Sequence, residues 1–325
     1  MIVESGPVEM WDTFWKEFLD TEKLHGKVEE IDETRRDLGF CETIEETCHE
    51  TYNRYHREIL PKLKEVQQDL IVLLQGVEGV HLSTSRIKTC PSLLRKIIEK
   101  SYKHLLSSSS LYAQLSSENF DEIVSDLLGL RFIINYRGKW ETVHSGIIKE
   151  FPLLERARYS ENKLLPHTKQ PYQVEWPKVY YAYGDDISAF EAAGLNVICH
   201  EKGYRSIHYT LSYKKTYVEL QVRTIYDEAW SDVDHRYVYK QEANTSSSAL
   251  NELSRILCRL TNISNDIGEE MRLIFNGEAQ ITISEGKYFV VNQETMDYFD
   301  GVLKALEETD DCLKQFRERM IKESS

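Results

Sequence analysis

Two stretches of the chain alternate between apolar and polar residues, as β-strands with one buried face do. Within residues 216–223, Val218, Leu220 and Val222 fall on one face of the predicted strand, and the other face carries Glu219, Gln221 and Arg223. Residues 201–211 form a second alternating stretch, and the basic pair Lys214–Lys215 joins the two. A connection this short predicts neighbouring antiparallel strands, so that polar residues from both stretches come close together.

Apolar residues spaced three and four apart predict that residues 9 to about 110 are mostly helical. One face of the first helix is formed by Trp11, Phe14, Trp15, Phe18 and Leu19. Packing in the core is the favoured interpretation of this face, and an exposed surface for oligomer or partner contact is the alternative. Leu60 to Leu74 predicts a second amphipathic helix.

Shorter elements are predicted after a serine-rich break at residues 107–110. Asn119 and Glu122 predict the capped start of a helix that Gly129 ends, directly before a buried strand over residues 130–135. The remaining elements are predicted to be a strand near 196–200, helices over 226–239 and 247–275, a hairpin over 279–292 and a charged final helix. The first of these helices is expected to bury Ala229, Trp230, Val233 and Tyr237.

This order of elements predicts an α+β fold, in which helices flank a mixed β-sheet. We expect a helical N-terminal extension over residues 1–79, a core over 80–240, and C-terminal helices with a hairpin over 241–325. Residues 150–185 contain four of the seven prolines and five tyrosines, which predicts a long irregular insertion in the core.

Composition narrows the function classes. The chain has 325 residues and a formal net charge of −14, which argues against a general electrostatic binder of nucleic acids. The longest apolar run, near residues 70–74, is too short to cross a bilayer, and the N-terminus lacks a signal-peptide pattern. The six cysteines include no Cys-x-x-Cys pair. We therefore expect free thiols, a cytoplasmic location and no membrane association.

Residues suited to phosphate chemistry form four blocks in chain order: Arg86 to Lys96, Asp126 to Arg131, Gly203 to His208, and Glu219 to His235. Asp126 and Glu219 are two carboxylates able to hold one Mg²⁺, a cation that takes oxygen ligands. The charge that a polyphosphate requires is available from Arg86, Lys88, Lys96, Arg131, Arg205 and Arg223. Taken singly, each residue also fits a solvated loop or a packed strand, so the combination carries the interpretation.

The four blocks resemble the synthetase domain of the RelA/SpoT family, which includes the small alarmone synthetases. That family carries the motifs Arg-x-Lys-Ser, Asp-x-x-Gly-x-Arg, Gly-Tyr-Arg-Ser-x-His and Glu-x-Gln-x-Arg-Thr, followed by Ala-Trp and a carboxylate–His pair. The resemblance covers roughly residues 80–240. It implies a fold related to nucleotidyltransferases, and transfer of pyrophosphate from ATP to the ribose 3′-hydroxyl of an acceptor nucleotide with release of AMP.

The resemblance also implies roles for the matching residues. Asp126 and Glu219 are expected to be catalytic and to bind Mg²⁺, with Glu219 also accepting the proton of the 3′-hydroxyl. ATP is expected to contact Arg86, Lys88, Thr89, Ser92, Lys96 and Arg131, with the two arginines enclosing its adenine. Tyr204 is expected to stack on the acceptor base. The acceptor site is expected to be completed by Lys202, Arg205, His208, Gln221 and Arg223.

Three departures from the family pattern concern the first binding loop and the acceptor side. Thr89 stands where serine is usual, residues 150–185 lengthen the gap between the second and third blocks, and Cys199 to Lys202 replace a Lys-Pro-rich approach. None of the ten histidines is followed by aspartate, so we expect no alarmone hydrolase activity.

The sequence is compatible with three functions. The leading one is a Mg²⁺-dependent synthetase that uses ATP as donor and GDP, GTP, ADP or ATP as acceptor. The second is a toxin that pyrophosphorylates the 3′ end of tRNA, for which a basic patch could be formed by Lys149, Arg156, Arg158, Lys163 and Lys169. The third is a non-catalytic nucleotide sensor or partner-binding module. A homo-oligomer, or a protein partner that neutralises or triggers the chain, is compatible with each.

Overall fold

The computed structural model describes residues 7–106, 110–150, 177–183, 185–201, 203–239, 248–277, 281–284, 287–290 and 293–323. Its centre is a sheet of six strands in the order β1-β2-β6-β5-β3-β4. The strands are β1 (Leu82–Ile87), β2 (Leu128–Ile134), β3 (Lys178–Tyr181), β4 (Asn196–Cys199), β5 (Ser206–Tyr213) and β6 (Thr216–Thr224). The pairs β2–β6 and β3–β4 are parallel and the other pairs are antiparallel. The predicted α+β class with a mixed sheet is therefore confirmed.

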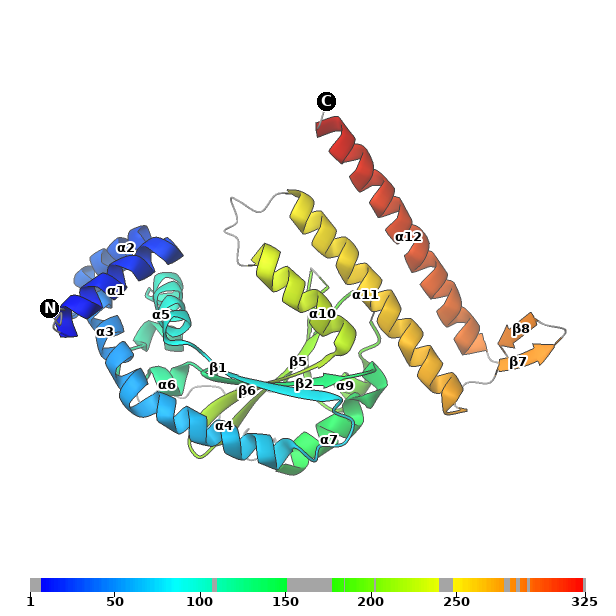
Figure 1. Ribbon diagram of the computed structural model, residues 1–325, viewed down its shortest axis with the longest axis horizontal. Helices are drawn as coiled ribbons and strands as arrows, with labels where there is room; N and C mark the ends of the chain where they lie inside the picture. The colour runs from blue at the N-terminus through cyan, green and yellow to red at the C-terminus, as the bar shows by residue number, and fades with distance from the viewer. Residues whose placement is uncertain are drawn as a thin grey trace, which may run out of the picture.

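Helices cover both faces of this sheet (Figure 1). The N-terminal helices are α1 (Pro7–Glu22), α2 (His25–Asp37), α3 (Ile44–Arg54), α4 (Leu60–Leu74) and α5 (Cys90–His104). The helices that follow are α6 (Phe120–Ile123), α7 (Trp140–Glu150), α9 (Ser188–Ala192), α10 (Ile225–Asp234), α11 (Ser248–Phe275) and α12 (Gln293–Glu323). Short 3₁₀ or π segments are Tyr55–Ile59, Leu111–Gln114, Arg137–Lys139 and His235–Tyr239.

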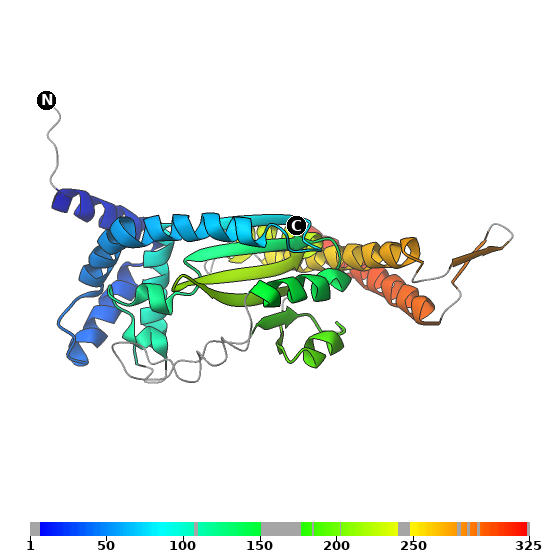
Figure 2. The same cartoon turned by 90° about the horizontal axis from the view of Figure 1, so that it is seen from below.

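The two faces of the sheet differ in chemistry. On the apolar face, Tyr209 of β5 meets α7, where Trp140 Nε1 donates to its hydroxyl over 3.2 Å, and α4 packs against β1. On the other face, α10 follows β6 and packs beside α11, and α12 packs beside α11 in turn (Figure 1). The hairpin of β7 (Ile281–Ser284) and β8 (Lys287–Val290) lies at the end of the molecule away from the N-terminal helices (Figure 2).

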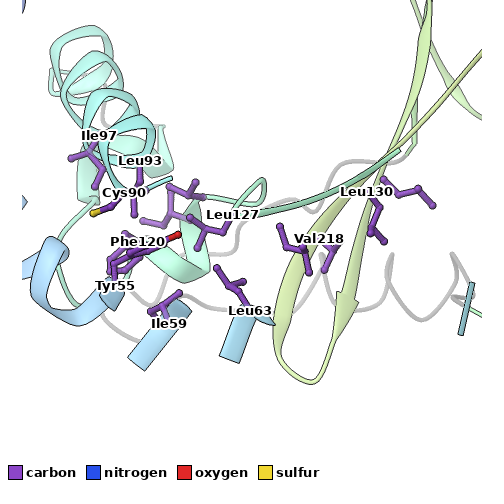
Figure 3. Packing of buried hydrophobic residues seen from close by; sticks show 14 of the residues in the cluster. Tyr55, Ile59, Leu63, Cys90, Leu93, Ile97, Phe120, Leu127, Leu130 and Val218 are labelled. Carbon is purple, nitrogen blue, oxygen red and sulfur yellow. The ribbon is translucent and has the colours of Figure 1, made fainter. Parts of the chain in front are cut away.

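One hydrophobic cluster joins the N-terminal helices to the sheet (Figure 3). It runs from Trp11 in α1 to Val222 in β6 and includes Tyr55, Leu63, Leu93 and other buried residues. Trp11, Trp15, Phe18 and Leu19 are all buried in it, which confirms that the aromatic face of the first helix is a core surface. The hydroxyl of Tyr55 also donates to the carbonyl oxygen of Lys88. The helical extension thus holds the backbone of the first chemical block in place.

Most of the predicted elements are present, since α4, β4, β5, β6, α11 and the C-terminal hairpin match the expected ranges closely. The expectation that residues 9 to about 110 are mostly helical is confirmed, but the strand β1 within this range was not predicted. This edge strand has the sequence Leu-Ser-Thr-Ser-Arg-Ile and is exposed along much of its length, so no apolar alternation marks it. Its antiparallel pairing with β2 forms it instead.

Two local predictions were also wrong. Gly129 lies inside β2 and does not end a helix, since α6 is a single turn and Asn119 forms no side-chain cap. The amide oxygen of Asn119 instead accepts from the backbone nitrogen of Ser116 over 2.8 Å. Of the four residues expected to be buried over 226–239, only Trp230 is buried, because the opposite side of α10 and of the segment that follows it faces solvent. The strand β3 and the helix α9 were not predicted; β3 lies within the stretch expected to be irregular, most of which falls outside the described residues.

No helix in the described part of the chain is both long and apolar enough to span a membrane.

Candidate functional site

The strand registers place the predicted site residues in two rows on the polar face of the sheet. Residues paired across neighbouring strands point to the same face. One row runs across four strands as Arg86, Gly129, Glu219 and Thr210. The next row runs across five strands as Thr84, Arg131, Gln221, His208 and Lys178. Residues from all four chemical blocks therefore meet on one surface.

Gly129 lies beneath the side chain of Arg86 in the first row. A Cβ atom added to Gly129 would lie 3.5 Å from Cγ of Arg86, so the arginine side chain lies across the glycine backbone. The guanidinium of Arg86 is near enough to Glu219 to lower the pKa of that carboxylate, against the larger effect of burial. Arg86, an exposed arginine on the edge strand, thus lies over the backbone of the second block and reaches toward the centre of the sheet.

Asp126 lies in the turn before β2 and faces two lysines. Its Oδ1 lies 2.8 Å from Nζ of Lys96 on α5, and its Oδ2 lies 3.1 Å from Nζ of Lys88. Burial opposes ionisation of Asp126, but Lys96 and Lys88 outweigh it and hold the pKa of the carboxyl below its ordinary value. Burial likewise opposes the charge on Lys96, and Asp126 outweighs it and raises the lysine pKa. Asp126 is therefore an ionised carboxylate at neutral pH.

Glu219 has the opposite electrostatic character. Burial raises its pKa, and the negative charge of Asp126 raises it further. One oxygen, Oε2, accepts a hydrogen bond of 2.8 Å from Nε2 of Gln221. The other, Oε1, lies 3.6 Å from Nδ1 of His208. Because burial, with Arg223 next, lowers the pKa of His208 to about 3, this histidine is neutral and forms no ion pair. Two carboxylates of opposed pKa shift are typical of sites that transfer protons.

Arg223 is the centre of a hydrogen-bond network behind Glu219. It donates to Oε1 of Gln221 over 2.6 Å, to Oγ of Ser206 over 3.1 Å and to Oγ of Ser231 over 2.7 Å. It also donates to the hydroxyl of Tyr204, and this hydroxyl is 2.9 Å from Nε2 of His208. The side chain of Arg223 is 5% exposed, so it is an internal support of the site.

The ring of Tyr204 lies in an aromatic cluster. Tyr180 and His208 approach it edge-on, with ring centroids 5.6 and 6.0 Å away, and the guanidinium of Arg223 lies over the ring at 5.0 Å. His200 and Trp230 pack at tilted angles. Stacking of Tyr204 on an acceptor base stays a prediction.

Arg205 was placed in the acceptor site by resemblance, and its contacts in this structure are with another acidic side chain. Its Nε and Nη2 each donate to a carboxylate oxygen of Asp185 over 2.7 Å, in a two-pronged ion pair. Asp185 in turn lies 3.8 Å from Arg137, which also contacts Asp266 of α11 at 3.3 Å. This ionic cluster joins the third chemical block to α11.

Thr89 and Ser92, the remaining predicted residues of the first block, lie at the start of α5. Thr89 is the N-cap residue of α5, and its hydroxyl donates to Oγ of Ser92 over 2.9 Å. Lys202 lies outside the described residues, as do four of the five basic residues of the possible tRNA patch. Lys149 near the end of α7 is the described one.

Gly203, the first residue of the third block, is packed against α11, and this contact can be tested by substitution. Its φ of 79° lies in the left-handed region, and an added Cβ would lie 2.8 Å from Sγ of Cys258. We expect Gly203→Ala to lower the free energy of unfolding by about 1–3 kcal/mol. Urea denaturation measures this change.

Gly194 offers a matched control for this substitution. Its φ is 71°, but nothing lies within 4 Å of an added Cβ, so Gly194→Ala carries the backbone cost alone. Gly203→Ala should be the more destabilising of the two, and Cys258→Ala should recover part of the difference. Equal effects of the two glycine substitutions would show that the contact with Cys258 has no influence.

Sequence reasoning missed several residues that the structure brings to the site. Glu228 in the first turn of α10 contacts Arg131 and Arg223, and Asp185 holds Arg205. Thr224 and Asp227 form a capping box that starts α10 directly after β6. The pattern Thr-x-x-Asp after an alternating strand was a readable signal for this helix start. Asp185 carried no such signal, because it lies 20 residues before its partner.

The carboxylates of Asp126 and Glu219 are the described side chains best suited to bind a metal ion. Among the described residues, no group of three or more His, Cys, Asp and Glu side chains could hold a metal. Asp126 and Glu219 are nevertheless two carboxylates close enough for the charge of Asp126 to raise the pKa of Glu219. A pair of protein carboxylates, completed by water and substrate phosphates, is the usual protein contribution to a Mg²⁺ site. The residues present therefore fit Mg²⁺.

The structure is thus an α+β fold with a mixed sheet. One face of this sheet is rich in carboxylates, arginines and lysines. Residues 85–244 match the family described as "Region found in RelA / SpoT proteins". The chain carries this RelA/SpoT region, and the resemblance found in the four blocks is confirmed.

Solved structures with similarity to the chain include three with low sequence identity. One is the small alarmone synthetase 1 from Bacillus subtilis, at 18% identity and a TM-score of 0.45, covering 69% of this chain and 99% of that one. The same protein bound to its product pppGpp is 16% identical, with a TM-score of 0.43, and the match covers 69% of this chain and 99% of that one. A GTP pyrophosphokinase family protein from Streptococcus pneumoniae is 15% identical, with a TM-score of 0.40, and the match covers 68% of this chain and 94% of that one. A comparison with curated proteins found no match.

Proposed function

We propose that the chain is a pyrophosphokinase that transfers pyrophosphate from ATP to the ribose 3′-hydroxyl of a guanosine or adenosine nucleotide. The observation that carries the proposal is the pairing of Asp126 and Glu219, two carboxylates with opposite pKa shifts, on a face lined by cations. The match of residues 85–244 to the RelA/SpoT region supports it. The core that performs the reaction is proposed to span residues 80–240.

On the donor side, the polyphosphate of ATP is proposed to replace Asp126 as the partner of Lys88 and Lys96. Both lysines lie within 3.1 Å of Asp126, so their charges are concentrated at one point of the site. Arg86 and Arg131 lie on neighbouring strands in adjacent rows, where two guanidinium planes can enclose an adenine. Thr89 and Ser92 add hydroxyl groups at the start of α5.

On the acceptor side, Glu219 is proposed to accept the proton of the 3′-hydroxyl. The 3′-oxygen attacks the β-phosphorus of ATP, a new O–P bond forms, and the bond from the β-phosphorus to the α,β-bridging oxygen breaks to release AMP. A raised pKa makes Glu219 a better proton acceptor than an ordinary glutamate. Gln221 and Arg223 hold the carboxylate in place through the hydrogen bonds described above.

Asp126 and Glu219 are proposed to hold a Mg²⁺ ion. When bound, this ion supplies positive charge that stabilises the phosphate oxygens during transfer. The lysines and arginines of the face share that task, so catalysis rests mainly on positioning and electrostatic stabilisation.

The pH dependence of the transfer rate at limiting Mg²⁺ tests the proton acceptor, because this rate reports groups of the enzyme before the metal ion binds, and a bound Mg²⁺ would itself lower the pKa of Glu219. Glu219 must be ionised to accept a proton, and its pKa is raised by burial and by Asp126. Activity should therefore fall, as the pH decreases, at a higher pH than an ordinary glutamate would give. The histidine next to it, with a pKa of about 3, should contribute no transition near pH 6.5. An acidic limb at or below the ordinary glutamate pKa would contradict this role for Glu219.

The acceptor is identified by incubating the purified chain with Mg²⁺ and γ-³²P-labelled ATP. GDP, GTP, ADP, ATP and bulk tRNA are supplied in separate reactions, and the products are separated by thin-layer chromatography. The proposal expects label on a free nucleotide. Label on tRNA alone would replace the proposal with the toxin function, and no transfer to any acceptor would favour the non-catalytic function.

A further inference from the structure

Glu228 lies where helix α10 begins above the polar face of the sheet. It is the fourth residue of that helix, whose start is fixed by the capping box between Thr224 and Asp227. The capping box anchors the first turn of α10 to the end of β6, so the position of Glu228 is set by the strand that also carries Glu219 and Arg223. A rigid strand–helix junction is a suitable base for a group that positions others.

The carboxylate of Glu228 bridges two arginines from neighbouring strands. Its Oε1 accepts a short hydrogen bond from Nη1 of Arg131 on β2, and its Oε2 lies 3.2 Å from Nη1 of Arg223 on β6. The side chains of Glu228 and Arg131 are 24% and 28% exposed, so both are half-buried next to the face that the substrates must reach. One negative charge thus separates two positive charges that would otherwise repel each other.

The two arginines depend on Glu228 to different degrees. Arg223 has further partners in Ser206, Tyr204, Gln221 and Ser231. Within the described part of the chain, the side-chain hydrogen bond of Arg131 goes to Glu228. Loss of Glu228 therefore leaves Arg223 held by neutral groups, whereas Arg131 regains the freedom of a long side chain.

We propose that Glu228 is a positioning residue for the donor nucleotide, which holds the guanidinium of Arg131 in the orientation that receives the adenine of ATP. This inference rests on the proposed function, in which Arg131 contacts ATP. A guanidinium that is already oriented loses less conformational entropy when a planar base binds against it. Glu228 acts through Arg131 and touches neither the reacting phosphate nor the 3′-hydroxyl in this account.

Glu228→Gln is the variant that tests the inference, because it removes the charge with little change of shape. We expect KM for ATP to rise about tenfold, the loss typical of one charge-assisted hydrogen bond, while kcat changes less than about threefold. In a chain that already carries Arg131→Ala, the same substitution should change KM less than about twofold, since its target is gone. An equal KM effect in both backgrounds, or tighter ATP binding by Glu228→Gln alone, would overturn the inference.

Asp232→Asn is a matched control on the same helix. Asp232 pairs with Arg236 at 3.1 Å on the exposed side of α10, so its loss should leave KM and kcat unchanged. A purely structural role for Glu228 predicts a lower melting temperature with an unaltered KM, and that result would also overturn the proposal.

Binding of α,β-methylene-ATP with Mg²⁺, measured by calorimetry, separates this inference from the proposed function. If the wild type binds the analogue but transfers no pyrophosphate, the function fails, and the positioning role is judged on the Kd of Glu228→Gln. A Kd about tenfold higher supports the role. An unchanged Kd, or a wild type that does not bind the analogue, would overturn it.

Discussion

Replacing Glu219 by glutamine is expected to lower the rate of pyrophosphate transfer by about 10²–10⁴-fold, the usual contribution of a positioned proton acceptor. The amide has nearly the same shape and can still accept the hydrogen bond from Gln221, but it cannot take a proton from the 3′-hydroxyl. The KM for ATP should stay within about twofold, because the proposed adenine contacts come from Arg86 and Arg131. Steady-state kinetics of the purified variant give both numbers.

Glu65→Gln serves as the control for Glu219→Gln. Glu65 lies on α4 and pairs with Lys214 at 2.7 Å on an exposed surface, so its loss should leave transfer unchanged. Wild-type turnover in Glu219→Gln would remove Glu219 from the mechanism. A large rise in the KM for ATP with an unchanged kcat would make it a donor-binding residue instead.

Replacing Asp126 by asparagine should have an effect of similar size, by a different route. Asparagine loses the anionic oxygens that a hard cation prefers, and it leaves Lys88 and Lys96 without their charged partner. We expect transfer at a fixed Mg²⁺ concentration to fall by at least about 100-fold, since replacing even a residue that only hydrogen-bonds to a metal ligand typically costs 10–100-fold in activity. The Mg²⁺ concentration that gives half-maximal rate should rise, which a titration of Mg²⁺ measures directly.

Asp121→Asn provides the comparison for Asp126→Asn. Asp121 lies five residues earlier and pairs with Arg54 of α3 at 2.8 Å, so its loss should affect stability more than Mg²⁺ dependence. An unchanged Mg²⁺ midpoint in Asp126→Asn, with transfer lowered, would show that Asp126 orders the two lysines and does not bind the metal.

The sequence was most informative where the same strand contributes apolar side chains to the core and polar side chains to the candidate site. Strict alternation in residues 216–223 predicted β6, and the residues on its polar side lie on the face described above. The short connection through Lys214 and Lys215 also predicted the antiparallel pairing of β5 with β6, which places His208 opposite Gln221. In such segments the pattern that buries the strand also fixes the direction of the polar side chains.

Other features could not be predicted from the chain because they depend on partners far along it. Gly129 was expected to end a helix, but it lies inside a strand where Arg86 of β1 crosses it, 43 residues earlier in the sequence. Arg205 belongs to a motif that implied substrate binding, and Asp185 holds it in an ion pair. Glu228 fits the solvated first turn of a helix, and only the fold reveals the two arginines that it bridges.

The central claim is that an intact pyrophosphate group moves and AMP is the leaving product. The most direct test compares α-³²P-labelled with γ-³²P-labelled ATP in reactions of the purified chain with Mg²⁺ and the acceptor that the panel identifies. We predict that the α label appears as AMP, in an amount equal to the γ label that appears on the acceptor, and that Glu219→Gln forms neither product at a comparable rate. Recovery of the α label as ADP, or of the γ label as free phosphate, would contradict pyrophosphate transfer.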